Sequence, residues 1–172
     1  MKVAAVRRID GTDEADLRAF VEIVNAVMPQ QPTSLEDLRW ADTLFAGGVR
    51  FLASLDGRPV GAASVGRIFM YDASFERFWW DVHVLPDARR LGLGGALWAA
   101  ASEVARAAGK TGFQTDVYES QADGVAFLLS RGFEIVERTK GVSLDQAAAL
   151  VLEEAHQRRE TLYGLRRGRM PA

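Results

Sequence analysis

The stretch from Val82 to Leu97 constrains this chain more than any other part of the sequence. An apolar run that is expected to form a strand ends at Pro86, and a basic turn rich in glycine then opens directly into an alanine-rich helix. Such a turn points several backbone N–H groups at one place, beside a helix N-terminus with partial positive charge. Glycine lets the main chain approach an anion closely because it lacks a Cβ. The stretch therefore predicts a phosphate-binding turn, to which Arg89 and Arg90 add positive charge.

The pattern of apolar residues predicts an α/β (α+β) fold with a mixed, mostly antiparallel sheet and helices on both faces. The expected strands cover residues 2–9, 49–55, 60–70, 75–84, 113–118 and 133–142. The expected helices cover residues 12–28, 33–45, 92–108, 120–131 and 143–160. The second to fourth strands follow one another as an antiparallel meander, and β-α-β units come after the glycine turn.

Short signals mark where these elements start and stop. Helix caps are expected at Thr12, at Thr33 with Glu36, at Ser120 with Asp123, and at Ser143 with Gln146. Asp56-Gly57 predicts a tight hairpin, and Gly132 predicts a helix end. The neighbours Trp79 and Trp80 are expected to point to opposite faces of their strand, where packing is the favoured role.

The composition of the chain excludes several kinds of site. The chain has no cysteine, two histidines and a net charge of -2, so disulfides and a histidine-rich metal site are excluded. No metal site is expected. No apolar run of about 20 residues is present to span a bilayer, and neither a signal peptide nor an overall basic charge is evident. We therefore expect a cytoplasmic protein that does not act on membranes. The basic C-terminal tail is expected to be a solvated end or an interface rather than a nucleic-acid site.

Two motifs resemble the GNAT superfamily of acyl-CoA-dependent N-acyltransferases. Its R-x-x-G-x-G signature follows a strand that ends in proline, and here it reads Arg89-Arg90-Leu91-Gly92-Leu93-Gly94. A looser F-Y-x-x-x-G-F motif corresponds to the segment Phe127–Phe133. The resemblance covers residues 2–142, so we expect an acetyltransferase domain over 1–142 and a C-terminal helix and tail over 143–172. The end of the chain also resembles the first half of tandem GNAT proteins.

The resemblance implies acetyl-CoA as cosubstrate and direct attack by an amine, without a covalent enzyme intermediate. The pyrophosphate would bind backbone N–H groups between Arg89 and Gly95, and the pantetheine arm would lie along the strand Asp81–Val84. In relatives a bulge splays this strand from the next one in the chain, so that its backbone is free to pair. The cofactor-binding residues implied are Val82, His83, Val84, Arg89, Arg90, Leu91, Gly92, Leu93, Gly94, Gly95 and Phe127.

The reaction needs a group that accepts the proton of the amine and, in many relatives, a tyrosine that protonates the leaving thiolate. Asp81 and His83 project to one strand face, and either is a candidate base; ordinary packing is the alternative for both. The tyrosine position is Leu128, which cannot donate a proton. Tyr118 is a candidate replacement, with packing as its alternative. Two further readings are that no acid is used and that the domain binds CoA without turnover.

Other nucleotide-binding folds fit less well. The third glycine of a dinucleotide fingerprint is Leu97 here, and a Walker P-loop sequence is absent. The C-terminal region departs from the family, because a polar helix is expected where a final strand usually follows. Either residues 161–166 form a late strand or a partner covers the sheet edge, and we expect a homodimer. A small-molecule amine is the favoured acceptor, but the sequence does not identify it.

Overall fold

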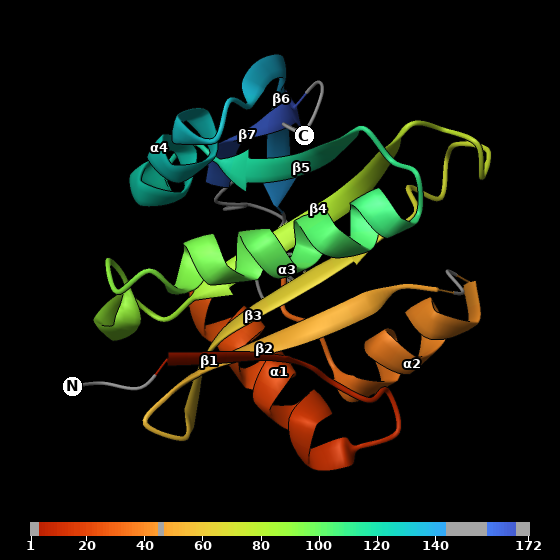
Figure 1. Ribbon diagram of the computed structural model, residues 1–172. Coiled ribbons are helices and arrows are strands. Elements are labelled where there is room, and N and C mark those ends of the chain that lie inside the picture. Colours follow the sequence, from red (N-terminus) through yellow and green to blue (C-terminus); the bar gives the residue numbers. More distant parts are fainter. Residues whose placement is uncertain (1–3, 45–46, 144–157, 168–172) are drawn as a thin grey trace, which may run out of the picture. The chain divides into compact units, whose positions relative to one another are not determined.

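The computed structural model describes residues 4–44, 47–143 and 158–167 (Figure 1). The chain divides into two compact units, the first ending at Phe113 and the second running from Gln114 to Arg169. Among the helices of the described ranges, none combines the length and the apolar character that crossing a bilayer requires.

The first unit contains a four-stranded antiparallel meander. Its strands are β1 (Ala4–Arg8), β2 (Val49–Leu55), β3 (Arg58–Gly66) and β4 (Arg77–Val84), each paired with the next. The tight hairpin predicted at Asp56-Gly57 is confirmed, with φ values of 51° and 82° at its two central residues. The β3–β4 pairing is continuous, whereas β2 and β3 shift register between Ala53 and Ser54.

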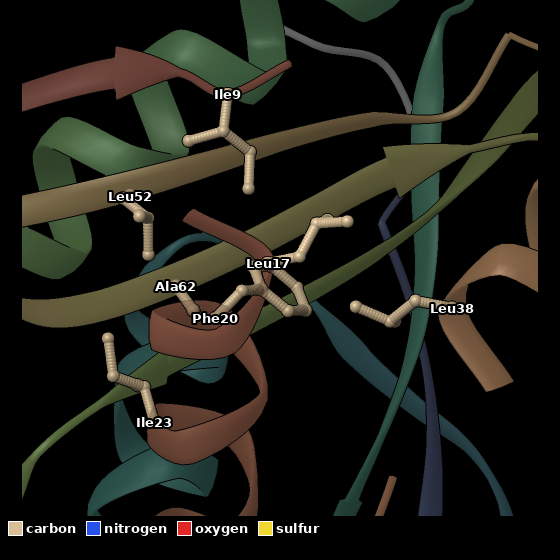
Figure 2. Close-up of a cluster of buried hydrophobic side chains, with 7 residues drawn as sticks. All are labelled: Ile9, Leu17, Phe20, Ile23, Leu38, Leu52 and Ala62. Atoms are coloured by element: carbon tan, nitrogen blue, oxygen red, sulfur yellow. The ribbon is translucent and has the colours of Figure 1, made fainter. Parts of the chain in front are cut away.

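Helices cover both faces of this meander, as predicted. Side chains alternate along β2 and β3, so Leu52 and Ala62 pack with α1 (Glu14–Val27) and α2 (Leu35–Leu44), as Figure 2 shows. Gly61 points the other way, where a Cβ would lie 3.3 Å from Leu97 Cδ1 in α3 (Leu93–Ala107). α1 and α2 therefore cover one face of the meander, and α3 covers the other.

Two predicted helix caps are wrong by one residue. α1 is capped by Asp13, whose carboxylate accepts from Ala15 N–H at 2.9 Å and Asp16 N–H at 3.2 Å, while Thr12 bonds to Asp10 instead.

α2 starts from a reciprocal Ser34–Asp37 pair rather than from Thr33 and Glu36. The main chain of Thr33 is already engaged, since the Asn25 side chain bonds to its N–H at 2.8 Å and to its carbonyl at 2.9 Å. This contact between α1 and the following loop moves the helix start by one position.

The second unit holds α4 (Ala122–Ser130), β6 (Glu134–Ser143), β7 (Arg158–Arg167) and most of β5 (Gly112–Tyr118). Gly132 ends α4 with φ 79°, as predicted. The predicted cap at Ser120 with Asp123 is wrong: the cap position is Gln121, which forms no side-chain cap bond.

The late strand exists and is longer than predicted. β7 pairs antiparallel with β6 from Glu134–Arg166 to Ser143–Arg158 and lies between β5 and β6 in strand order. The helix predicted over 143–160 is therefore wrong at both ends, because residue 143 and residues 158–160 are strand. Residues 144–157 of that prediction lie outside the described residues. The capping signal at Ser143 with Gln146 and the charged segment after it favoured a helix, but at residues 143 and 158–160 backbone pairing between β6 and β7 overrides this local preference.

Candidate active site

The glycine turn connects β4 to α3 through a short 3₁₀ turn, η1 (Pro86–Ala88). Two of its residues adopt left-handed backbone conformations, Arg90 with φ 62° and Gly92 with φ 83°. Gly92 caps α3, and a Cβ added there would meet nothing within 4 Å, so the space above the turn is open. The left-handed geometry at the cap favours glycine at this position.

The N-terminus of α3 is suited to an anion. The backbone bond from Ala96 N–H to Gly92 carbonyl, at 3.0 Å, opens the helix. The N–H groups of Leu93, Gly94 and Gly95 precede it and have no acceptor within the helix. Among the α-helices of the described ranges, α1, α2 and α4 each carry an acid in the first turn, whereas α3 carries none. The positive end of the α3 dipole is therefore left for a ligand.

The charged residues around the turn have different roles. Arg89 donates from Nε to the Val84 carbonyl at 3.1 Å, so it ties the turn to the end of β4 as well as adding charge. Asp87 pairs with Arg58 at 2.7 Å, which offsets the negative charge nearest the turn. Arg90 and Leu91 are exposed. The turn thus presents net positive charge to solvent.

The predicted shared face of Asp81 and His83 is confirmed. Asp81 lies opposite Ser64 and His83 opposite Ala62, on the side of the sheet that α1 covers. The intervening Val82 and the following Val84 point to the α3 side.

The Asp81 carboxylate is desolvated although the residue keeps some exposed surface. Its Oδ2 accepts from Trp79 Nε1 at 2.7 Å and from Ser64 Oγ at 3.3 Å. Burial raises the pKa of Asp81 from 3.8 to about 6, against the opposing effect of these two hydrogen bonds. A carboxylate with this pKa is ionised at pH 7 and is more basic than an exposed aspartate.

Burial makes His83 a weaker base, whereas it makes Asp81 a stronger one. It lowers the pKa of His83 from 6.5 to about 4, so the imidazole is neutral at pH 7 and a weak base. The structure thus separates two candidates that the sequence left equal.

Trp79 and Trp80 point to opposite faces, as predicted. Trp80 is fully buried and packs edge-on against Trp98 of α3 at 4.9 Å between ring centroids, with Phe113 at 6.0 Å. Trp80 is a core residue. Trp79 contacts the candidate base, a role that the sequence did not reveal, and Ser64 was missed altogether.

The remaining candidates belong to the second unit. Tyr118 is 9% exposed at the end of β5, where its carbonyl accepts from Gln121 N–H at 2.9 Å. Phe127 lies in α4 with the Arg131 guanidinium 5.1 Å from its ring centroid. Leu128 is buried at 4% exposure, consistent with a packing residue at the family's tyrosine position.

Comparison with known proteins identifies the class. The model of the acetyltransferase (GNAT) family matches residues 17–133. Among curated proteins, none matches the sequence.

Several solved structures share the fold. One is yncA of Salmonella typhimurium with its cofactor acetyl-CoA, at TM-score 0.72 and 20% identity over 96% of this chain and 93% of that chain. Another is the ribosomal-protein-alanine N-acetyltransferase of Brucella melitensis, at TM-score 0.71 and 23% identity over 95% and 99%. An N-acetyltransferase of Staphylococcus aureus Mu50 aligns at TM-score 0.74 and 17% identity over 96% and 98%.

The fold and the family match define an acyltransferase. The chain belongs to the acetyltransferase (GNAT) family, whose acyl donor is acetyl-CoA. The resemblance drawn from Arg89–Gly94 and Phe127–Phe133 is thereby confirmed.

Proposed function

We propose that this protein transfers the acetyl group of acetyl-CoA to a primary amine on a small-molecule acceptor. The observation that carries the proposal is the turn before α3, where open space, three N–H groups without helical acceptors and the absence of a first-turn acid coincide. Acetyl-CoA supplies an activated acetyl thioester, and its diphosphate matches the charge of this turn.

The turn would hold the diphosphate through main-chain N–H groups between Arg89 and Gly95, with Arg90 adding charge from the exposed rim. Beyond the turn, the strand residues Val82, His83 and Val84 are proposed to flank the pantetheine arm, and Phe127 to contact the cofactor from α4. The arrangement of β4 directly before the turn supports this order, because one continuous segment, residues 82–95, carries almost all of these groups.

Asp81 is the proposed general base. The acceptor amine is mostly protonated at neutral pH, so a proton must leave before its nitrogen lone pair can attack the acetyl carbonyl. Asp81 accepts this proton, directly or through one water, before the amine attacks. The nitrogen loses its second proton to water as the tetrahedral intermediate collapses, the C–S bond breaks and CoA leaves as the thiolate. With a pKa of about 6, Asp81 is ionised at pH 7 and suited to this task. His83, with a pKa of about 4, is the weaker candidate.

Tyr118 is the proposed proton donor to the thiolate. Leu128 occupies the position of the usual tyrosine and is buried, so the phenol at the end of β5 is the candidate in its place. A phenol has an ordinary pKa near 10 and is a suitable acid for a thiolate.

The substitution Gly94→Asp tests the cofactor site. A carboxylate in the first turn of α3 repels the diphosphate and opposes the helix dipole, so we expect acetyl-CoA affinity to fall by at least about 100-fold. Isothermal titration calorimetry with acetyl-CoA measures the change. Ala99→Asp places the same charge on an exposed position of α3 beyond the first turn, and should bind acetyl-CoA almost as the parent does.

Turnover is measured separately as thiol release from acetyl-CoA with a panel of amines. Unchanged affinity in the Gly94→Asp variant would overturn the placement of the diphosphate. Binding by the parent protein without thiol release for any amine would instead favour a CoA-binding module.

A further inference from the structure

Trp79 and Ser64 approach Asp81 from two directions. Trp79 lies two residues earlier on β4 and therefore on the same face, and Ser64 is the cross-strand partner of Asp81 on β3. The Trp79 indole donates at 2.7 Å and the Ser64 hydroxyl at 3.3 Å. The shorter bond comes from the group that is fixed by its ring, so Trp79 is the main determinant of the carboxylate orientation.

Both hydrogen bonds end on the same oxygen, Oδ2. Within the part of the chain that the structure describes, no hydrogen bond is formed to Oδ1 of Asp81. The two oxygens of one carboxylate therefore differ: one is saturated by the protein and the other is left to accept a further proton.

The chemistry of the indole fixes the direction of one of these two hydrogen bonds. An indole N–H donates and never accepts, so Trp79 keeps one of the two lone pairs of Oδ2 engaged, while the Ser64 hydroxyl engages the other. Oδ1, with its lone pairs not engaged by the described residues, is therefore the favoured site for a proton that reaches Asp81. A hydroxyl such as that of Ser64 could reverse its direction, and alone it would not enforce the choice.

We infer that Trp79 is a positioning residue for acetyl transfer, whose indole N–H holds Asp81 so that Oδ1 is the atom that takes the proton from the acceptor amine. This inference rests on the proposed role of Asp81 as general base. It assigns Trp79 to the mechanism and its neighbour Trp80 to the core, although the two residues are adjacent and of the same type.

Neither of two neighbouring polar groups that the structure describes, one on β4 and one on β2, replaces Trp79 as a donor. On β4, His83 lies on the same face and is neutral at pH 7. On β2, Arg50 is the register partner of Ser64, and its guanidinium is engaged by both oxygens of Asp42 at 2.8 and 2.9 Å.

The charged residues of α1 and α2, the helices on this face, form their ion pairs with residues other than Asp81. The charged residues of α1 and α2 that form ion pairs do so among themselves or with β1 and β2, as Glu14–Arg18, Glu14–Arg39, Asp16–Arg7 and Asp42–Arg50. The remaining charged residues of these two helices, Glu22, Glu36 and Asp37, are exposed. Burial, Trp79 and Ser64 are accordingly the causes that set the pKa of Asp81, and of the two hydrogen bonds the one from Trp79 lowers it more.

The substitution Trp79→Phe keeps an aromatic ring and removes the N–H donor. Losing a hydrogen bond to the carboxylate raises the pKa of Asp81, so the acidic limb of the kcat/KM profile should move to higher pH. We expect kcat to fall about tenfold at pH 7, with KM for acetyl-CoA unchanged. Ser64→Ala should move the limb in the same direction by less, and it provides a second route if Trp79→Phe folds poorly.

Trp80→Phe is the matched control, because it makes the same change on the opposite face, away from Asp81. It is expected to lower thermal stability while leaving the acidic limb in place. A Trp79→Phe enzyme that folds, binds acetyl-CoA and keeps the parent pH profile would overturn the inference, as would an equal shift in Trp80→Phe.

The substitution Asp81→Asn tests the proposed role of Asp81 as base independently of the positioning role of Trp79. Full activity in Asp81→Asn would refute Asp81 as base, whatever Trp79 does. An inactive Asp81→Asn together with a parental Trp79→Phe profile would refute only the positioning role. Carbon-13 NMR of the Asp81 carboxyl gives a readout without turnover, and its pKa should rise in Trp79→Phe and stay in Trp80→Phe.

Discussion

At the scale of one residue, the buried position of Asp81 gives its carboxyl a pKa different from that of an ordinary aspartate. Alternation along β4 predicted from sequence that Asp81 and His83 share a face, because that geometry depends only on neighbours in the chain. Their opposite pKa shifts were not predictable, since both arise from burial under segments distant in sequence. Neither was the Ser64 bond, which requires the β3–β4 register.

The pKa of Asp81 predicts a pH-dependent stability difference. The folded pKa of about 6 exceeds the ordinary 3.8, so the folded state favours the protonated form. The contribution of Asp81 to the free energy of unfolding is present below about pH 4 and is lost as pH rises through about 6. Asp81→Asn has no such loss, so its stability relative to the parent should increase between pH 4 and pH 7.

Thermal unfolding of both proteins at several pH values checks this prediction. His83 titrates in both, so the difference between them isolates Asp81. A stability difference that stays constant from pH 4 to pH 7 would contradict it. In the same variant, kcat/KM should fall by about 10²–10⁴-fold at pH 7 if Asp81 is the base.

At the scale of an element, the helix starts show that local sequence signals predict a helix but not its first residue. The helices themselves were predicted from apolar spacing, but Asn25 engages Thr33 and moves the start of α2 to Ser34 and Asp37. A contact across eight residues thus decided between two capping boxes that are one residue apart. Sequence spacing alone had no means to rank them.

The packing of β3 against α3 gives a prediction for an element pair. A Cβ on Gly61 would lie 3.1 Å from Ala53 Cβ and 3.3 Å from Leu97 Cδ1, closer than ordinary contact. Gly61→Ala should therefore lower the free energy of unfolding by about 1–3 kcal/mol, measured by urea denaturation. Gly11→Ala is the control, since its Cβ would lie 3.7 Å from its nearest neighbour, Asp42 Oδ2. An equal cost at both positions would argue against crowding at Gly61.

At the scale of the whole molecule, the main difference from the sequence-based prediction is the C-terminal strand β7. Sequence left open whether a late strand or a partner completes the sheet, and β7 pairs with β6 within the chain. The homodimer stays a prediction. Sedimentation velocity should give a species of twice the 18.9 kDa chain mass at micromolar concentration, and a single species at the chain mass would refute it.

The sequence by itself determined the order of elements up to residue 142, the Asp56-Gly57 hairpin and the glycine turn before α3, because each depends on residues that are adjacent in the chain. Tertiary structure alone decided that Asp81 is the stronger base, that Trp79 contacts it while Trp80 packs in the core, and that residues 158–167 form a strand. Those outcomes depend on burial and on pairing between distant segments, and neither is encoded in local spacing.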